Sequence, residues 1–279
     1  HFLPLQVYEP LRTEGKISWP LVVVLTDFDA HVLWAQFTGD RFFVPSDEVA
    51  DVLADKGIER GKISTAGIPI LPAFGRDYDR AAIRAGLGLR EGLPTLLVMG
   101  GAFGQGGLTD TVAMALQTAC VQVLAVAGKN EKARHELETL KPPAGSTLRV
   151  FGYVNNIPEL MAASDLVISK SGGLTLAECL AMGLPMLVPD PVPGQEERNC
   201  KYAIECGAAM CGDTRHSLRY KLKLMLETPG LLARMAAAAR AHGRPNAARD
   251  ILRSALEMAG APHTFTRTPG VNTGTLKVS

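Results

Sequence analysis

Short apolar segments alternate with helix-like segments along most of this chain, and this alternation limits the possible folds more than any other feature. Apolar runs of strand length lie at residues 20–26, 41–44, 63–66, 95–99, 121–127, 148–151, 166–169 and 185–188. Helical spacing with turn-type flanks lies at residues 131–140, 157–163, 174–182 and 196–206. Strands that alternate with helices pair in parallel and are joined by crossover helices. The sequence therefore predicts an α/β protein.

A change in composition at residues 67–94 divides the chain. Ile68-Pro69-Ile70-Leu71-Pro72 leads there into a charged stretch at residues 76–92, and proline favours extended backbone, so this segment is predicted to connect two domains. Five predicted strands follow it, enough for a doubly wound sheet, but only about three precede it. We therefore expect two Rossmann-like domains that face a cleft, with residues 1–90 forming an incomplete first domain plus linker and residues 91–258 the second.

The two ends of the chain have distinct compositions. The chain begins at His1 in an apolar segment, which suggests that upstream residues are missing, and residues 259–279 have the composition of a disordered tail. Residues 216–258 are predicted to be helical, with breaks at Pro229-Gly230 and Arg244-Pro245. Basic residues of this region indicate either a solvated helix face or contact with anionic lipid headgroups. They are Arg215, Arg219, Lys221, Lys223, Arg234, Arg240, Arg244, Arg249 and Arg253.

Composition also excludes several classes of protein. The formal net charge is +1, so no global field points to nucleic acid as a partner. The five cysteines include no Cys-x-x-Cys pair, which indicates reduced thiols in a cytosolic protein rather than a disulfide framework or a zinc site. The apolar run at residues 21–25 is far shorter than the ~20 residues of a membrane span. We expect a soluble or peripherally bound protein.

Two glycine-rich loops follow predicted strands of the second domain. One runs from Gly100 and Gly101 to Gly107, and the other is Lys170-Ser171-Gly172-Gly173-Leu174-Thr175. Glycines let backbone N–H groups approach an anion, and a helix N-terminus adds partial positive charge, so both loops are candidates for diphosphate binding. Glu178 follows one helical turn later and is a candidate for ribose hydroxyls. Its alternative role is to form a capping pair with Thr175.

A third loop, Pro191-Val192-Pro193-Gly194-Gln195-Glu196, follows the strand predicted at residues 185–188. Its prolines hold the backbone extended and its glycine permits a turn, so that Gln195 and Glu196 are presented at a helix start. The adjacent amide and carboxylate suit the vicinal hydroxyls of a hexose, although Glu196 can also serve only the helix dipole. Three such loops at the carboxyl ends of strands in one sheet predict one binding crevice.

The first domain offers two candidates for proton transfer. Asp27 and His31 lie in Thr26-Asp27-Phe28-Asp29-Ala30-His31, directly after the strand predicted at residues 20–26, with Trp34 a turn later. Polar groups at a strand end beside a cleft are candidates for acceptor handling or acid–base catalysis. A lone histidine is more often a structural hydrogen-bonding residue, and His31 has that alternative role.

These motifs together resemble glycosyltransferase family 28, in the branch of the monogalactosyldiacylglycerol synthases and processive diacylglycerol glucosyltransferases. The similarity covers residues 2 to about 256. Its two specific motifs are Lys170-Ser171-Gly172-Gly173-Leu174-Thr175 with Glu178, and Pro191-Val192-Pro193-Gly194-Gln195-Glu196. Further matches are Thr26-Asp27-Phe28 with His31 and Trp34, Gly67-Ile68-Pro69-Ile70, Gly128-Lys129-Asn130 and Gly152-Tyr153-Val154.

The resemblance implies a GT-B fold and an inverting, metal-independent hexosyltransferase that uses UDP-glucose or UDP-galactose. Residues 1–90 would then belong to the acceptor domain and residues 91–258 to the UDP-sugar donor domain. Val154 would lie beside uracil, Gly100 and Gly101 near the diphosphate, Gly173, Leu174 and Thr175 on phosphate, Glu178 on ribose, and Gln195 with Glu196 on the hexose. Members of this family begin with a glycine-rich loop, and a histidine in that loop is the expected general base. This chain starts after that point, so we expect it to lack the catalytic base.

The resemblance also implies a setting for the protein. It predicts glycolipid biosynthesis on diacylglycerol, at an anionic membrane surface, by a protein bound peripherally to the cytoplasmic face of the plasma membrane. Three alternatives stay open: a different acceptor such as a polyprenyl-linked precursor, a non-catalytic UDP-sugar-binding module, and an epimerase of the GT-B type. The sequence does not decide between glucose and galactose.

Overall fold

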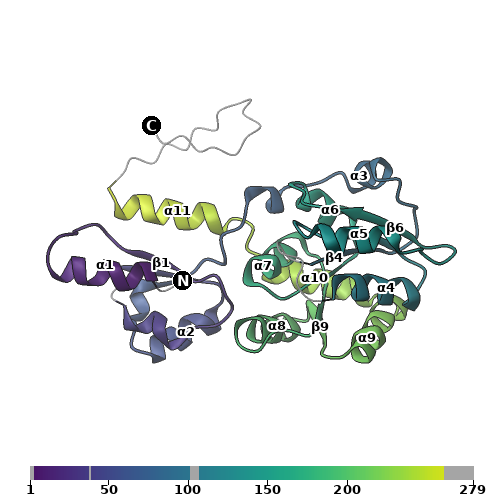
Figure 1. The fold of residues 1–279 in the computed structure, drawn as a ribbon. Helices are drawn as coiled ribbons and strands as arrows, with labels where there is room; N and C mark the ends of the chain where they lie inside the picture. The colour runs from purple at the N-terminus through teal and green to yellow at the C-terminus, as the bar shows by residue number, and fades with distance from the viewer. Residues whose placement is uncertain (1–2, 38, 101–106, 261–279) are drawn as a thin grey trace.

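The computed structural model describes residues 3–37, 39–100 and 107–260 (Figure 1). The predictions for Gly101 and for a disordered tail beyond residue 260 therefore lie outside the described residues. The helices and strands are α1 (Leu3–Thr13), β1 (Val22–Val24), η1 (Val32–Gln36), β2 (Arg41–Val44), α2 (Asp47–Asp55), η2 (Arg60–Lys62), β3 (Ile63–Thr65), η3 (Pro72–Gly75), α3 (Arg80–Gly86), β4 (Thr95–Met99), α4 (Leu108–Thr118), β5 (Gln122–Val126), α5 (Glu131–Thr139), β6 (Thr147–Phe151), α6 (Ile157–Ala163), β7 (Leu166–Ile168), α7 (Gly173–Met182), β8 (Met186–Pro189), α8 (Gln195–Glu205), β9 (Ala209–Gly212), α9 (Arg215–Glu227), α10 (Leu231–His242) and α11 (Ala247–Met258).

Two parallel sheets confirm the predicted α/β class. The first has the order β1-β2-β3 and the second the order β6-β5-β4-β7-β8-β9. All eight predicted strands are present, with ends that differ by up to two residues. The expected five strands of the second sheet are one too few, because β9 was not predicted. Its sequence, Ala-Met-Cys-Gly, lacks the β-branched and aromatic residues that mark a strand, and it pairs only with β8 at the sheet edge.

Alternate residues of the second sheet pack into two separate cores. Leu97, Leu124 and Val167 face helices α6, α7 and α8. Their chain neighbours face the opposite way, toward α4, α5 and α9. Side chains of a strand alternate between its two faces, so helices on both sides bury the whole sheet. This arrangement leaves the ends of the strands as the edges at which polar loops gather.

The segment at residues 67–94 is only partly the extended connection that its prolines predict. It contains η3 and α3, and Asp79 Oδ1 caps α3 by accepting a 2.9 Å hydrogen bond from the Ala82 N–H. Helix α3 packs against α6 of the second unit. Two more helices that were not predicted, α1 and α2, cover the first sheet. Ser46 is the N-cap residue of α2, and its hydroxyl accepts a hydrogen bond from the Val49 N–H at 3.3 Å.

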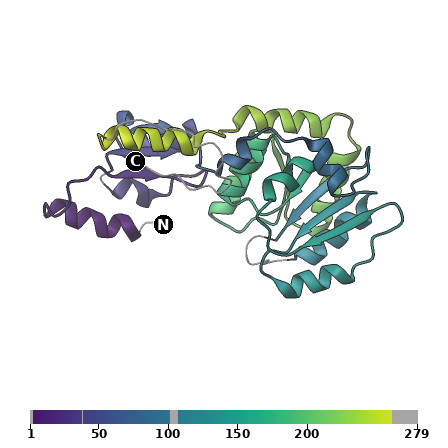
Figure 2. The same cartoon turned by 90° about the horizontal axis from the view of Figure 1, so that it is seen from above.

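The helical prediction for residues 216–258 is confirmed, with breaks at both predicted positions. The three helices do not stay together. Figures 1 and 2 both show α11 alongside the first sheet, while α9 and α10 cover the second. The chain thus crosses between the units a second time, near Gly67, where an added Cβ atom would lie 3.3 Å from the Ala247 Cβ. None of the helices within the described residues is long and apolar enough to cross a membrane.

Candidate functional site

The three predicted binding loops follow three neighbouring strands, β4, β7 and β8. The strand order reverses between β4 and β7, since the chain first proceeds outward to β5 and β6 and then returns to β7. Ligands of doubly wound sheets bind outside the carboxyl ends of the strands at such a reversal. Gly100 directly follows β4 beside this point, and its N–H donates to the Val126 carbonyl at 3.2 Å. Gly107, which has a left-handed backbone, is the N-cap residue of α4.

The loop after β7 leads into α7, whose second residue, Leu174, is exposed. Gly172 is the N-cap residue, and no side chain in the described part of the chain caps the helix. An added Cβ atom on Gly172 would meet no atom of the described residues within 4 Å. The first N–H groups of a helix have no partner within the helix, so those of Leu174 and Thr175 are available to an anion. Lys170, at the end of the strand, is partly exposed and adds positive charge to the same loop.

Glu178 lies one turn into α7 with its carboxyl group half-buried. Burial raises the pKa of this group to about 7. The alternative role as a capping partner is not seen, because the helix has no side-chain cap. A desolvated carboxyl group beside a candidate binding loop has the character of a functional residue.

This raised pKa predicts how stability depends on pH. Between the ordinary value of 4.5 and about 7, the folded chain keeps on Glu178 a proton that the unfolded chain releases. The free energy of unfolding should therefore decrease as pH rises through this window, by up to about 3 kcal/mol from this group. Glu178→Gln should remove that decrease and stabilise the chain at pH 8. Urea unfolding of both chains at pH 5 and pH 8 measures the difference, and equal pH dependence would contradict it.

The loop after β8 is linked to the loop after β7. The Ser171 hydroxyl donates to the Glu196 carbonyl at 2.6 Å, and the Glu196 carboxylate accepts from the Val192 N–H at 3.1 Å. Gly194, with φ of 105°, makes the turn into α8. Asp190, directly after β8, has φ of 30°, and it is the one non-glycine residue with positive φ in the described part of the chain. Such backbone strain gathers at functional sites, and it marks this strand end.

The end of β1 in the first unit lies directly against these two loops. An added Cβ atom on Gly173 would lie 1.9 Å from the Thr26 carbonyl oxygen, so only glycine fits there. The Asp27 carboxylate accepts hydrogen bonds from the Gln195 and Asn199 side-chain amides, each at 3.0 Å. The Asn199 oxygen accepts in turn from the Phe28 N–H at 2.7 Å. The predicted donor loops and the predicted acceptor-side loop thus meet.

Apolar contacts hold the same junction together. Phe28 stacks on Tyr202 of α8 with ring centres 4.2 Å apart, and burial raises the pKa of the Tyr202 hydroxyl. Ile68 and Ile70 pack into the same core of the second unit as Phe28. Asn199 was not among the predicted site residues. Its signal is the spacing of four residues from Gln195 on one helix, which places both side chains on one face.

The remaining predicted residues lie around this junction. His31 is exposed and is the N-cap of η1, where its Nδ1 accepts from the Leu33 N–H at 3.2 Å, so it has at least the structural role that was its alternative. Val154 follows β6 and packs against the core, and the neighbouring Tyr153 ring is exposed, with Lys129 Nζ 5.6 Å from its centre. Among the described residues, no three or more His, Cys, Asp or Glu side chains lie close enough together to hold a metal ion.

Two family models match separate parts of the chain. The model of the glycosyltransferase family 28 C-terminal domain matches residues 95–251, which contain all three donor loops. The model of monogalactosyldiacylglycerol (MGDG) synthase matches residues 1–70, which contain the Thr26–His31 loop. The boundary between the two matches falls in the segment that connects the two sheets.

Two curated relatives are processive diacylglycerol beta-glucosyltransferases from Bacillus mycoides (strain KBAB4) and Bacillus cytotoxicus. Each is 34% identical, over 250 and 255 residues, and the matches cover 89% and 91% of this chain. The chain spans 64% and 66% of the length of these relatives.

Solved structures show the same fold at lower identity. MurG of Acinetobacter baumannii superposes with a TM-score of 0.65 at 19% identity, covering 88% of this chain and 68% of that one. HepE of Anabaena, solved in complex with UDP and glucose, gives a TM-score of 0.57 at 16% identity, covering 90% and 74%. These likenesses confirm the predicted GT-B fold, of which the chain holds a part. The family model over residues 95–251 covers more than half of the chain, and it shows that the chain belongs to glycosyltransferase family 28.

Proposed function

We propose that the crevice beside α7 binds a UDP-sugar and that the protein transfers its hexose, glucose or galactose, to diacylglycerol. One observation carries the donor part: the uncapped N-terminus of α7, with Glu178 one turn later, lies at the strand-order reversal of the second sheet. Helix N-termini at such reversals bind phosphate groups in nucleotide-binding sheets. The names of the relatives support diacylglycerol as acceptor, and the UDP complex of HepE supports the donor.

The donor would lie across the three loops in the order of its parts. Gly100 and the start of α7 from Gly173 to Thr175 would hold the diphosphate, and Glu178 the ribose hydroxyls. Val154 would lie beside uracil, and Gln195 with Glu196 would contact the hexose. The Glu196 carboxylate already accepts from the Val192 N–H, so it contributes its remaining lone pairs.

Transfer of the hexose would proceed by inversion. The acceptor hydroxyl oxygen forms a bond to the sugar C1 as the bond from C1 to the UDP oxygen breaks. The hydroxyl proton passes to a base, and UDP leaves with the bonding electrons. The dipole of α7 and its free N–H groups would stabilise the charge that grows on UDP. We expect these groups to suffice without a metal ion, so a chelator added to the transfer assay should leave the rate unchanged.

An anionic membrane surface on the cytoplasmic side is part of the same proposal, and α9 is its best-supported contact. Arg215, Arg219 and Lys223 are exposed and lie four residues apart, so they form one row. Tyr220, which is 62% exposed, lies in the adjacent row. Cations beside an exposed aromatic ring suit the interface of an anionic bilayer. Lys223 lies 3.8 Å from Glu227, so Arg215 and Arg219 are the main cations of this row. On α11, Arg249 and Arg253 both pair with Asp250.

Calorimetry with UDP and a transfer assay test the two halves of this function. The chain should bind UDP, and no detectable heat at millimolar UDP would remove the donor assignment. UDP-glucose and UDP-galactose, each radiolabelled in the sugar, should then give labelled lipid on diacylglycerol vesicles with the full-length protein. Label in a new UDP-sugar without acceptor would indicate an epimerase instead.

Two substitutions should separate the nucleotide contact from the sugar contact. Glu178→Ala should weaken UDP binding, because it removes the proposed bonds to ribose. Gln195→Ala should leave UDP binding intact and weaken only the binding of the UDP-hexose. Each lost hydrogen bond is worth about 0.5–1.5 kcal/mol, and more where the acceptor is charged. Titration of both variants with UDP and UDP-glucose measures this, and equal effects on UDP alone would contradict the division.

A further inference from the structure

The Asp27 carboxylate lies at the centre of a hydrogen-bond chain that joins the two units. One of its oxygens accepts from Gln195 Nε2 and the other from Asn199 Nδ2, each at 3.0 Å. The chain continues from the Asn199 oxygen to the Phe28 N–H at 2.7 Å. Gln195 and Asn199 are 168 and 172 residues away from Asp27 in the sequence. All three groups lie at the edge where the proposed hexose contact is made.

The chemistry of these groups leaves only one orientation for each amide. A carboxylate is an acceptor only, so both amides must turn their nitrogen toward Asp27. Asn199 then points its oxygen at the Phe28 N–H, which is a donor only. The orientation of the Gln195 carboxamide is therefore fixed by Asp27, which leaves its oxygen and its second N–H for a ligand. An amide held in one orientation can distinguish a sugar hydroxyl that donates a hydrogen bond from one that accepts a hydrogen bond.

The Asp27 carboxylate is held in place by its hydrogen bonds and is not a free acidic group. Both of its oxygens accept an amide N–H, and Asn199, on which one of them depends, is fully buried. Other contacts hold the loop in place independently of Asp27. Asp29 forms an ion pair with Arg198, and Phe28 stacks on Tyr202. A conservative change at Asp27 should thus alter the amide orientation without releasing the loop.

We propose that Asp27 is a positioning residue for donor selection: with Asn199, it orients the Gln195 carboxamide toward the hexose of the UDP-sugar. This inference rests on the proposed function, and it gives Asp27 a role other than that of a catalytic base. It also makes donor selection depend on both units, because the residue that orients Gln195 comes from the first sheet.

Asp27→Asn tests this role. The new side chain has one acceptor and one NH₂ group but faces two amide donors, so it can satisfy only one of them. It should satisfy the buried Asn199, because an unpaired group costs more there than at the exposed Gln195. The NH₂ group at position 27 then faces Gln195 and favours the reversed orientation, in which the Gln195 carboxamide turns its oxygen toward position 27. The ratio of UDP-glucose affinity to UDP affinity, measured by calorimetry, should fall about three- to tenfold, with UDP affinity itself unchanged.

Exchange of the two side chains provides the rescue. In the double variant Asp27→Asn with Asn199→Asp, the carboxylate at position 199 accepts from the Phe28 N–H and from the NH₂ group at position 27. The oxygen at position 27 then faces Gln195 Nε2 again, so every hydrogen bond is restored with one direction reversed. The affinity ratio should return to within about twofold of the original. In a Gln195→Ala background, Asp27→Asn should change nothing.

Each outcome decides between the proposals. An unchanged ratio in Asp27→Asn, or a reduced ratio that the exchange does not restore, would overturn the positioning role. The second result would mean that hexose binding needs the negative charge at position 27 rather than the hydrogen bonds that fix Gln195. If the unchanged chain bound neither UDP nor UDP-glucose, the proposed donor site would fail and this inference with it. Binding of both by the unchanged chain therefore separates failure of the inference from failure of the function.

Discussion

Gly173→Ala should destabilise the chain and abolish its binding of UDP. The added methyl group would lie 1.9 Å from the Thr26 carbonyl oxygen and 3.0 Å from its carbon. Both are backbone atoms at the end of β1, so no side-chain rotation can relieve the overlap, and either the loop of the first unit or the start of α7 must move. Overpacking of this kind costs about 1–3 kcal/mol, occasionally more. Displacement of α7 also moves the N–H groups proposed to hold phosphate.

Gly172→Ala is the matched control for this prediction. It adds the same methyl group one residue earlier, where the backbone has φ of −59° and none of the residues that the structure places has an atom within 4 Å. The free energy of unfolding should change by less than about 0.5 kcal/mol. UDP binding should still weaken, because the methyl group enters the space proposed for the diphosphate. Urea unfolding and calorimetry on both variants give the comparison, and a Gly173→Ala chain with unchanged stability would contradict the close approach.

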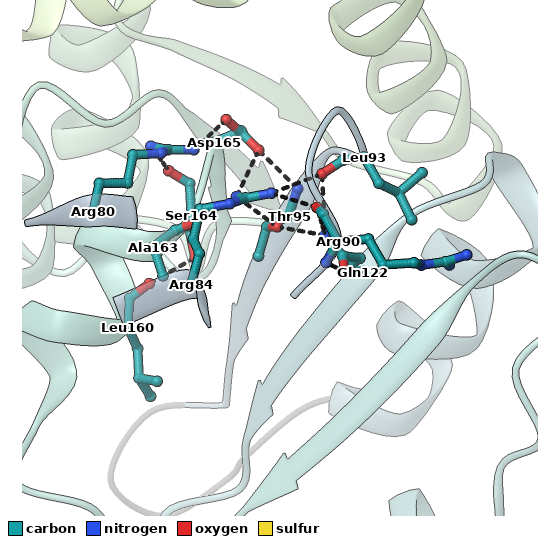
Figure 3. Close-up of polar contacts among 10 residues, drawn as sticks. All are labelled: Arg80, Arg84, Arg90, Leu93, Thr95, Gln122, Leu160, Ala163, Ser164 and Asp165. Atoms are coloured by element: carbon teal, nitrogen blue, oxygen red, sulfur yellow. Dashed lines mark hydrogen bonds and ion pairs between the residues drawn. The ribbon is translucent and has the colours of Figure 1, made fainter. Parts of the chain in front are cut away.

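Arg84→Ala should strongly destabilise the chain at the end of the second sheet that lies away from the binding loops. Arg84 lies on α3 and donates to Thr95 Oγ1 and to the backbone carbonyls of Ala163, Arg90 and Leu93, at 2.8 to 3.2 Å (Figure 3). Its side chain is only 14% exposed, and it also lies 3.7 Å from the Asp165 carboxylate. Removal leaves these acceptors without their donor. We expect a loss of about 2–4 kcal/mol in the free energy of unfolding.

Arg80→Ala provides the comparison for this network. Arg80 pairs with the same Asp165 carboxylate at 2.5 Å, but its side chain is 45% exposed. Its removal should cost no more than about 1 kcal/mol, because water replaces an exposed partner. Both variants should keep their UDP affinity, since Thr95 starts β4 and Asp165 precedes β7, at the end of the sheet away from the binding loops. Equal losses from the two arginines, measured by urea unfolding, would contradict the role given to Arg84.

The sequence determined the elements and the loops of the second unit. A strand that is buried on one or both faces has apolar residues at every second position or in one continuous run, so its burial can be recognised from the local sequence. Every predicted strand is present, and β4 matches its predicted bounds. The loops after β4, β7 and β8 were predicted to share one crevice, and these strands are neighbours in the sheet. Parallel strands place their carboxyl ends at one edge, so this convergence follows from strand order and needs no contact information. β9 was not predicted because its sequence has none of the β-branched or aromatic residues that indicate a strand.

Only the tertiary structure decided which surfaces of the two units meet. Asp27 and Phe28 read in the sequence as polar and apolar residues after a strand, and nothing near them indicates Asn199 or Tyr202 as their partners. Gly173 reads as a phosphate-loop glycine, yet the Thr26 carbonyl is what excludes a side chain there. The basic residues of the C-terminal region form one stretch in the sequence, but the fold places α9 and α11 on different units. Local patterns record how deeply a residue is buried, because solvent acts on each residue separately. The partner of a residue depends on contacts between segments far apart in the chain, and those exist only once both sheets are packed.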